Sequence, residues 1–352
     1  MDRRACCVSQ PFGASRKEGR GIEKSGTSSE KAIWELLTGP TPVVVTAHVR
    51  IDGDALGAAL ALWHALRDAG QECRTFFDSV IPVTYDFLPG LAERAASPQE
   101  LPERFVLAVL DTGSLDRIGC LAAHVHQAVS VLNIDHHATN SQFGDLNYVD
   151  PAASSSGEIV YRILEAGGAP LTKEIADSLY TAILTDTGRF SFPNTTPAAY
   201  EICGRLVEAG CRPQKLTEKI YSSLPESAVR LQALVLGTLK LEAGGCIATM
   251  ELTEEMLDST EASETDTQGF AEMPVSVRGV SVSALVKEMA EAPGRIKVCL
   301  RGRPSADGVD VRAVAEGFGG GGHRSAAGCV LEGDIERVRR VVVEKLCESL
   351  RQ

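Results

Sequence analysis

Short apolar runs alternate with amphipathic stretches from about Ser29 to Ala209. Runs that are almost continuously apolar predict parallel strands buried on both faces of a sheet, and they lie at Val43–Ala47, Phe105–Leu110 and Val131–Ile134. Apolar residues that recur at helical spacing predict helices, and they lie at Ala55–Ala69, Gly157–Ala166 and Thr172–Thr185. The alternation predicts an α/β domain with a doubly wound, mostly parallel sheet.

The second half of the chain carries both patterns on a smaller scale and predicts a smaller C-terminal α/β domain. Its strands are expected at Cys246–Met250, Val280–Leu285, Ile296–Arg301 and Ala326–Leu331, and its helices at Asp310–Glu316 and Ile335–Leu350. The polar segment Asp258–Gln268 is expected to be a mobile surface loop. The predicted organisation is a disordered tail (1–28), a first domain (29–225), a connecting helix (226–243, with its helical pattern at Glu226–Leu241) and a second domain (244–352).

Composition narrows the classes of function. Acidic residues outnumber basic ones by 47 to 35, for a net charge of -12, which argues against a protein that coats long duplex nucleic acid. No apolar run approaches the roughly 20 residues that cross a bilayer, so no membrane partner is expected. The ten cysteines show no C-x2-C spacing, which favours a reducing cytoplasm.

Acids and histidines follow the apolar runs of the first domain. They are His48, Asp52 and Asp54 after the first run, Asp111 after the second, Asp135, His136 and His137 after the third, and Asp186 at the end of a predicted helix. The carboxyl ends of parallel strands share one sheet edge, where open α/β folds place their chemistry. Carboxylates and imidazoles together favour Mn over Mg, with Co also compatible, and two acids one residue apart suit a two-metal site.

Each motif also has a plainer structural interpretation. Asp54 can cap the helix that begins at Ala55, Asp111 can serve a turn, and the histidines can be core residues. Asp186 is harder to explain this way, because the helix dipole disfavours an acid at a helix C-terminus. Glycines 319–322 can be a flexible linker, or they can bring backbone N–H groups to a phosphate.

These residues together resemble the motifs of the DHH phosphoesterase superfamily with its DHH-associated C-terminal domain. The matching motifs are His48-Val-Arg-Ile-Asp-Gly-Asp-Ala-Leu-Gly57, Leu110-Asp-Thr-Gly113, Asp135-His-His137, Thr185-Asp-Thr-Gly188 and Gly319-Gly-Gly-Gly-His-Arg-Ser-Ala-Ala-Gly328. Within the superfamily, the short two-domain form is most similar to the oligoribonuclease (nanoRNase) and 3′-phosphoadenosine 5′-phosphate (pAp) phosphatase group. The chain departs from the usual motif at Ile51 (usually Pro), Ala58 (usually Ser) and Arg324 (often uncharged).

The resemblance implies an active site in the cleft between the two domains and a role for each motif. His48, Asp52 and Asp111 would hold one Mn ion, and Asp54, Asp111, His136 and Asp186 the other, with Asp111 bridging. Asp135 would orient a histidine, and His137 would face the scissile phosphate. Substrate phosphates would be bound by Arg189, Arg301, His323 and the glycines Gly320, Gly321 and Gly322.

The implied activity is two-metal hydrolysis of short RNA oligonucleotides to mononucleotides, with pAp dephosphorylation to AMP as a second activity. A phosphodiesterase for linear or cyclic dinucleotides, such as pApA or cyclic di-AMP, would use the same residues. An inorganic pyrophosphatase is disfavoured by the Gly-rich loop, and a catalytically inactive nucleotide-binding module by the full set of acids. The sequence does not fix the oligomeric state, and a homodimer is compatible with it.

Overall fold

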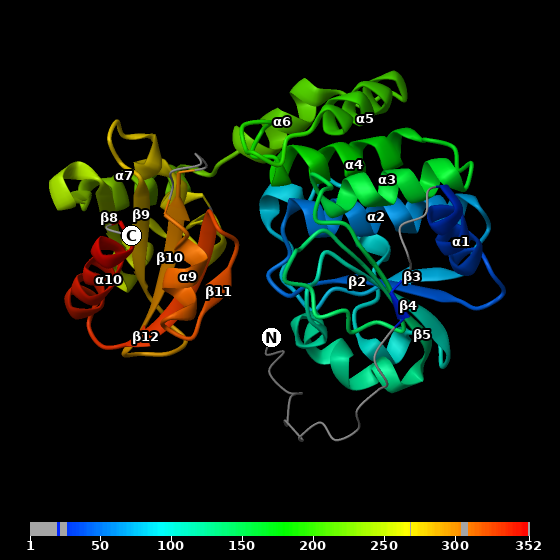
Figure 1. The fold of residues 1–352 in the computed structure, drawn as a ribbon, viewed down its shortest axis with the longest axis horizontal. Helices are drawn as coiled ribbons and strands as arrows, with labels where there is room; N and C mark the ends of the chain where they lie inside the picture. The colour runs from blue at the N-terminus through cyan, green and yellow to red at the C-terminus, as the bar shows by residue number, and fades with distance from the viewer. Residues whose placement is uncertain (1–19, 22–26, 268, 304–308, 351–352) are drawn as a thin grey trace. The chain divides into compact units, whose positions relative to one another are not determined.

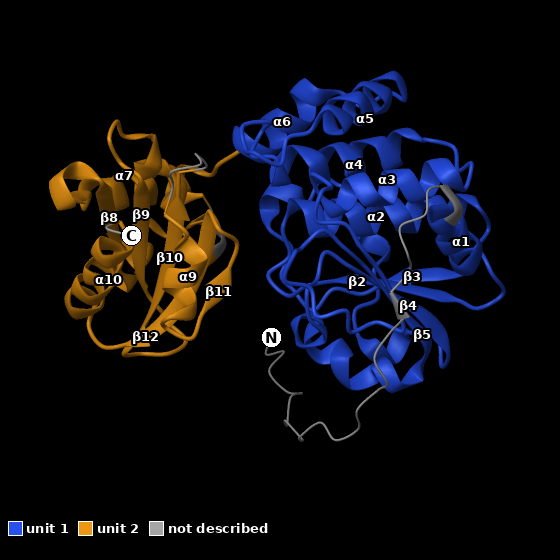
Figure 2. Cartoon of the chain, viewed as in Figure 1, with its two compact units in different colours: residues 1–222 blue, residues 223–352 orange. Residues whose placement is uncertain are grey.

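A computed structural model describes residues 20–21, 27–267, 269–303 and 309–350. The chain forms two compact units, residues 1–222 and 223–352 (Figure 2). The segment expected to connect two domains, 226–243, lies inside the second unit. Most of the expected tail (1–19 and 22–26) lies outside the described residues, but Arg20–Gly21 form a short strand and a helix begins at Thr27.

The first unit is built on a six-stranded parallel sheet in the order β1-β6-β5-β4-β2-β3 (Figure 1). Its strands are β1 (Arg20–Gly21), β2 (Val43–Ala47), β3 (Cys73–Thr75), β4 (Phe105–Leu110), β5 (Ala128–Asp135) and β6 (Leu146–Val149). The predicted strands β2 and β4 have the expected bounds, and β5 extends the predicted run at both ends. The doubly wound, mostly parallel arrangement is confirmed.

Helices cover one face of this sheet. They are α1 (Thr27–Leu37), α2 (Gly53–Asp68), α3 (Ser156–Ala166) and α4 (Lys173–Asp186), with α5 (Pro197–Glu208) and α6 (Pro213–Tyr221) packed outside them. Their apolar side chains form one continuous core with β2, β4 and β5. The 3₁₀ segment η4 (Leu115–Gln127) packs on the opposite face, where a second core includes Phe105 and Leu107. Burial on both faces explains why these strands are apolar throughout.

The strand order reverses direction between β2 and β4. From β2 the chain runs outward to the edge strand β3, and it then returns to the other side of β2 to form β4, β5 and β6. Loops at such a switch point diverge and leave a crevice at the carboxyl edge of the sheet. The loops after β2 and β4 carry His48 and Asp111, so these two residues come together at the switch point.

The second unit contains a mixed six-stranded sheet in the order β11-β12-β10-β9-β8-β7. The strands are β7 (Lys240–Glu242), β8 (Ile247–Leu252), β9 (Val282–Glu288), β10 (Arg295–Gly302), β11 (Gly321–Gly322) and β12 (Ala326–Glu332). Helices α9 (Val311–Glu316) and α10 (Ile335–Ser349) pack on one face, and α7 (Glu226–Gly237) and α8 (Glu254–Thr260) on the other. The smaller α/β domain is therefore confirmed.

Two expectations for the second unit differ from the structure. The helix predicted over Glu226–Leu241 ends at Gly237, because the chain turns at Thr238 and β7 pairs with β8. The polar segment Asp258–Gln268, expected to be a mobile loop, contains regular structure within its described part, Asp258–Thr267. It continues α8, forms a 3₁₀ turn, and covers the buried ammonium of Lys287 with the carboxylate of Glu264, 3.2 Å away. No helix among the described residues is long and apolar enough to cross a membrane.

Candidate metal centre

The loop after β2 brings three candidate ligands to the carboxyl edge of the sheet. His48 is buried, and its Nδ1 lies 2.8 Å from the Val49 carbonyl oxygen, so Nδ1 carries the proton and Nε2 is left for a ligand. Nε2 lies 3.6 Å from Asp52 Oδ2. The other carboxylate oxygen of Asp52 accepts the Ala55 N–H at 3.0 Å, so Asp52 caps α2. The capping role considered for Asp54 therefore belongs to Asp52.

Asp54 lies in the first turn of α2 and is almost fully buried. Its two oxygens accept the backbone N–H groups of Ser156 (2.7 Å) and Gly157 (2.9 Å), which open α3. The positive end of the helix dipole and the unpaired N–H groups of a first turn both stabilise a carboxylate there. The N-terminus of α3 thus fixes the orientation of Asp54.

Asp111 occupies the loop after β4 with a backbone φ of +54°, which is uncommon for a residue with a Cβ. Its Oδ2 lies 3.4 Å from His48 Nε2, while its Oδ1 lies 3.6 Å from His136 Nε2. Oδ1 also accepts a hydrogen bond from the Ser156 hydroxyl at 3.0 Å. The two oxygens of Asp111 therefore face different imidazoles.

Asp135 ends β5 and is fully buried. Its Oδ1 accepts the backbone N–H of His136 (2.9 Å) and lies 2.6 Å from His137 Nδ1, and its Oδ2 accepts the side-chain amide of Asn140 (2.5 Å). Both oxygens are engaged in orienting the histidine loop. The imidazoles of His136 and His137 are 10% and 14% exposed, so neither is a core residue.

Asp186 is the last residue of α4, and its Oδ2 lies 3.6 Å from His136 Nε2. Glycines allow α2 and α4 to approach closely enough for this contact. A Cβ on Gly53 would lie 2.4 Å from Thr185 Oγ1, and one on Gly57 would lie 2.4 Å from the Ser178 carbonyl oxygen. The glycines of this motif are thus required by helix packing, which brings Asp54 and Asp186 to the same imidazole.

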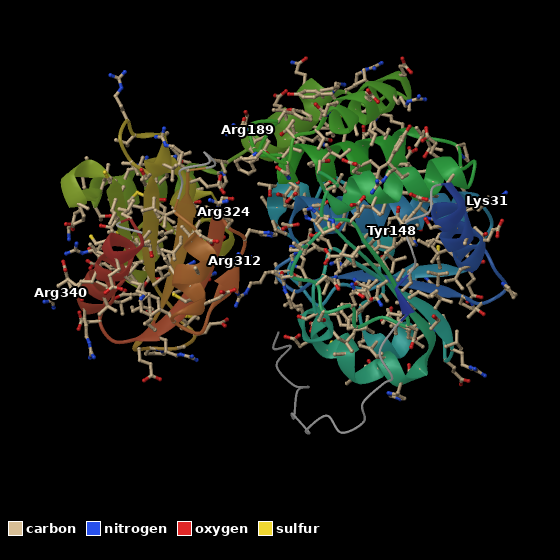
Figure 3. The ribbon with its side chains drawn as sticks, viewed as in Figure 1. Lys31, Tyr148, Arg189, Arg312, Arg324 and Arg340 are labelled. Atoms are coloured by element: carbon tan, nitrogen blue, oxygen red, sulfur yellow. The ribbon has the colours of Figure 1, made fainter. Side chains whose placement is uncertain are left out.

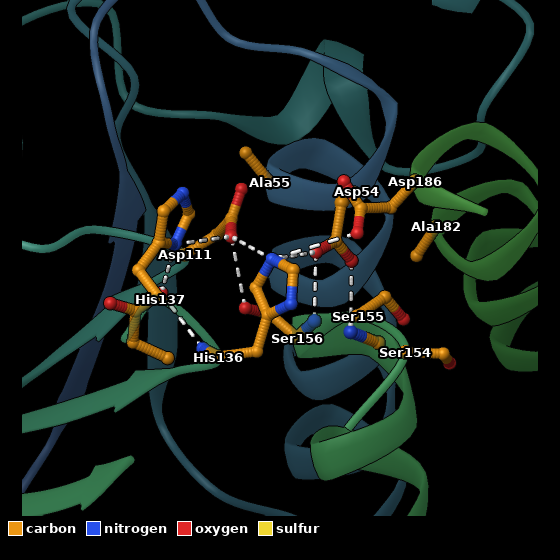
Figure 4. Close-up of polar contacts among 12 residues, drawn as sticks. Asp54, Ala55, Asp111, His136, His137, Ser154, Ser155, Ser156, Ala182 and Asp186 are labelled. Carbon is orange, nitrogen blue, oxygen red and sulfur yellow. Dashed lines mark hydrogen bonds and ion pairs between the residues drawn. The ribbon is translucent and has the colours of Figure 1, made fainter. Parts of the chain in front are cut away.

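The result is three overlapping groups of potential ligand atoms, drawn in part in Figure 4. Ligand atoms within 4.8 Å of one another group as His48, Asp52 and Asp111 (the first cluster), as Asp54, His136 and Asp186 (the second cluster), and as Asp111, His136 and His137. Asp111 belongs to the first cluster and faces His136 of the second. Imidazole nitrogens and carboxylate oxygens suit a divalent metal ion, so the residues present fit a divalent-metal site.

Two family models match the chain: the DHH family, N-terminal domain, over residues 42–183, and the DHHA1 domain over residues 245–351. The bifunctional oligoribonuclease and PAP phosphatase NrnA of Thermus thermophilus is 33% identical to the chain over 334 residues, which span 92% of this chain and 98% of that protein. The chain belongs to the DHH phosphoesterase family. It is accordingly a hydrolase of phosphate esters with a candidate His/Asp metal site.

Solved structures agree with this assignment. A crystal structure of an exopolyphosphatase-related protein from Bacteroides fragilis superposes with a TM-score of 0.82 at 26% identity, over 94% of this chain and 98% of that one. RecJ of Thermus thermophilus in complex with Mn²⁺ has a TM-score of 0.53 at 13% identity, over 93% of this chain and 55% of that one. The second similarity is one of fold alone.

The departures from the usual DHH motif do not touch the clusters. Ile51 and Ala58 are both buried apolar residues of the first unit's core. The Ile51 N–H donates to Ser79 Oγ at 3.1 Å, a bond that a proline at this position would not make. This hydrogen bond is a local reason for a residue other than proline at position 51.

The charges of the clusters strongly perturb one another. Burial opposes ionisation of Asp54 and, with the nearby Asp111 and Asp186, raises its pKa well above the usual range. Burial likewise raises the pKa of Asp186 to about 7, although His136 opposes the shift. Burial disfavours charge on His48 and His137, but hydrogen bonds donated to the carboxylates of Asp111 and Asp52 raise the pKa of His48 to about 10, and one donated to Asp135, with the nearby negative charges, raises the pKa of His137 to about 9. Burial also opposes ionisation of Asp111, yet the three histidines hold its pKa below the usual range.

Neighbouring carboxylates add to the effect of burial on Asp54 and Asp186, and carboxylates that face the imidazoles favour their protonated form. A divalent ion would displace those protons.

The residues expected to bind substrate come from both units. Arg189, of the first unit, is exposed (Figure 3), and its guanidinium stacks 4.8 Å from the ring centre of Tyr221. Arg301, on β10 of the second unit, lies 3.3 Å from Glu272. His323 is exposed at the turn between β11 and β12.

Glycines 319–322 form an ordered β-hairpin, so the flexible-linker interpretation is wrong. Gly321 and Gly322 pair with β12, and a Cβ on Gly320 would lie 2.2 Å from the Gly328 carbonyl oxygen. The N–H groups of Gly319 and Gly320 donate to carbonyls at the end of α9. The N–H groups of Gly319 and Gly320 are therefore used within the fold, so the phosphate contact expected of Gly320 is not made through its N–H.

Sequence reasoning did not assign roles to the residues that hold the ligands in place. Ser156, Asn140 and Asn194 contact Asp111, Asp135 and Asp186 respectively. The sequence does indicate the position of Ser156, because Ser155 and Glu158 form a capping-box pattern that marks a helix N-terminus. No sequence pattern indicates the roles of Asn140 and Asn194, because loop geometry determines which residues they contact.

Proposed function

We propose that this phosphoesterase hydrolyses short RNA oligonucleotides to mononucleotides and dephosphorylates pAp to AMP, with two Mn ions as its preferred cofactors. The observation that carries the chemistry is Asp111, whose Oδ2 faces His48 and whose Oδ1 faces His136. The substrates are suggested by the Thermus thermophilus relative, named a bifunctional oligoribonuclease and PAP phosphatase, which aligns over 92% of this chain.

The proposed ligand sets follow the two clusters. His48, Asp52 and Asp111 would hold one ion, and Asp54, Asp111, His136 and Asp186 the other. Bound divalent ions would supply an activated water and neutralise charge on the phosphate. Mg and Co can replace Mn in such a ligand set.

His137 would act on the substrate as a proton donor. Its Nδ1 is held 2.6 Å from Asp135 Oδ1, so Nε2 lies on the opposite side of the ring from Asp135. Burial opposes the charged ring, but the hydrogen bond to Asp135 together with the charges of Asp111, Asp135 and Asp186 raises the pKa of His137 to about 9 in the metal-free protein. An imidazolium can then stabilise negative charge on a phosphate oxygen or protonate a leaving oxygen.

Residues outside the clusters would hold the rest of the substrate. Arg189 of the first unit, and Arg301, His323, Gly321 and Gly322 of the second, are the proposed phosphate-binding groups. A guanidinium can bind a phosphate with two parallel hydrogen bonds. The eight cysteines among the described residues are all free, in keeping with the reducing cytoplasm proposed for this protein.

A hydrolysis panel with added Mn tests the proposal. It compares pAp, pApA, RNA from dimers to ~24-mers, cyclic di-AMP, pyrophosphate and polyphosphate. We expect the highest kcat/KM for RNA dimers to tetramers and for pAp. A kcat/KM at least tenfold higher for cyclic di-AMP, pyrophosphate or polyphosphate would reject the proposed substrates, while full turnover after exhaustive chelation would reject the metal centre.

A further inference from the structure

Asn194 connects two parts of the metal centre that are far apart in the sequence. Its side-chain Nδ2 lies 2.8 Å from the Ser154 carbonyl oxygen, 3.1 Å from the Asp186 carbonyl oxygen and 3.1 Å from Asp186 Oδ2. The residue is half-buried, in the loop between α4 and α5. One amide therefore bridges the segment that precedes α3 and the carboxylate that ends α4.

The segment before α3 already positions other ligands. Ser154 is two residues from Ser156, whose N–H holds Asp54 Oδ2 and whose hydroxyl holds Asp111 Oδ1. Ser154 is itself fixed, because its N–H and hydroxyl both donate to Glu158 Oε2. A contact with the Ser154 carbonyl thus connects Asp186 to the rigid turn that orients Asp54.

Asp186 needs such support more than the other acids do. It ends α4, where the helix dipole disfavours a negative charge, and Gly188, Arg189 and Phe190 follow it with positive φ values of 54°, 59° and 61°. The chain thus leaves α4 through consecutive left-handed residues, a conformation that costs free energy for residues with a Cβ. After this turn the chain runs back toward α4, and the side-chain amide of Asn194 donates a hydrogen bond to Asp186 Oδ2.

We propose that Asn194 is a positioning residue that sets the distance between Asp186 and Asp54 and so determines the affinity of the second cluster for its ion. The inference rests on the metal centre of the proposed function but not on the substrate. Groups that orient metal ligands commonly change metal affinity by about 10–100-fold when they are removed. We expect the affinity for only one of the two ions to change by this amount.

The test is Mn binding to the full chain by isothermal titration calorimetry, for the wild type and for Asn194→Ala. The matched control is Asn147→Ala. Asn147 is buried on β6, and its side chain exchanges hydrogen bonds of 2.8 and 2.9 Å with the backbone of Gly144 rather than with a candidate ligand. For Asn194→Ala, one of the two dissociation constants should rise about 10–100-fold and the other should stay within about threefold. The control should leave both unchanged.

Steady-state kinetics give a second readout. The lost kcat of Asn194→Ala should be largely recovered at high Mn concentration, a recovery that a general loss of structure would not produce. Two unchanged dissociation constants, or equal weakening of both together with a lower melting temperature, would overturn the proposal. If Asn194→Ala fails to fold, Asn194→Ser, which keeps a small donor, decides by the same criteria. A wild type that binds two Mn ions but cleaves no substrate of the panel would reject the proposed function and leave this inference standing.

Discussion

Asp135 Oδ1 lies 2.6 Å from His137 Nδ1, and Asp135 is fully buried. The acid that opens the motif is thus within hydrogen-bond distance of the second histidine, and its other oxygen accepts from Asn140. The close groups of potential ligand atoms among the described residues do not include Asp135. Its role is therefore to orient the histidine loop.

Asp135→Asn should lower kcat by about 10–100-fold while Mn stoichiometry stays at that of the wild type. In this variant an amide N–H can face the Asn140 amide, which lies 2.5 Å from Asp135 Oδ2 in the wild type. The substitution also removes one of the negative charges that raise the pKa of His137. Steady-state kinetics and Mn titration of the same preparation check both parts. A loss of bound Mn with unchanged kcat at saturating metal would contradict this role.

Asp111→Ala should abolish binding of both ions and reduce kcat/KM at least as much as any other single ligand substitution. Among the described residues of the clusters, only the Asp111 carboxylate faces both His48 and His136. The metal-free variant should stay folded, because Asp111 lies in the loop after β4 at the sheet edge; it loses the ion pair with His48 but also the repulsion between Asp111 and Asp54. Circular dichroism melting in chelator provides that control. A variant with a near wild-type rate would make Asp111 a turn residue only.

The stabilisation conferred by Mn should grow as pH rises from 6.5 to 9. The pKa of His48 is raised from 6.5 to about 10 and that of His137 to about 9, so the metal-free protein holds their protons and loses this stability as pH increases. The raised pKa values of Asp54 and of Asp186, about 7 for the latter, act in the same direction. Bound ions take the place of the protons. Melting temperatures with and without Mn should therefore diverge by on the order of 5 °C more at pH 9 than at pH 6.5. An equal increase in melting temperature on addition of Mn at both pH values would contradict this coupling between metal binding and proton release.

Arg301→Ala and His323→Ala should raise KM by about tenfold and leave Mn binding unchanged, since one lost phosphate contact is worth roughly 1.5 kcal/mol or more. Both residues belong to the second unit, whereas every candidate ligand belongs to the first. Arg340→Ala, an exposed arginine of α10 in the same unit, is the matched control and should behave as wild type. Weakened Mn binding in either test variant would reject a role confined to substrate.

Hydrolysis should slow steeply as RNA grows beyond a few nucleotides. The chain carries a net charge of -12, which repels a long polyanion, whereas a short one can be held by a few local arginines. Initial rates on RNA of two, five and ~24 nucleotides, at equal molar concentration, measure this. Equal rates on the dimer and the ~24-mer would contradict the expected preference.

The parts that were predictable from sequence are those with a local physical cause. Burial on both faces makes β2, β4 and β5 apolar, and their carboxyl ends necessarily meet, so the ligands could be grouped before the structure was known. Strand β3 has three residues and β6 has four, too few for a periodic pattern. The contacts of Asn194 depend on a left-handed turn. Arg301 and Arg189 were proposed from family resemblance, and their pairing with Glu272 and Tyr221 follows from tertiary structure alone.

The reversal of strand order between β2 and β4 has a consequence for how the protein acquires its metals. His48, Asp52 and Asp54 are synthesised early, yet their partners arrive only with Asp111, His136 and Asp186. A nascent chain that ends before residue 105 holds three of the six proposed ligands and has no β4 to pair with β2. We therefore expect metal uptake to follow the assembly of the sheet and α4. Limited proteolysis of truncated chains, with and without Mn, would show protection beginning only when α4 is complete.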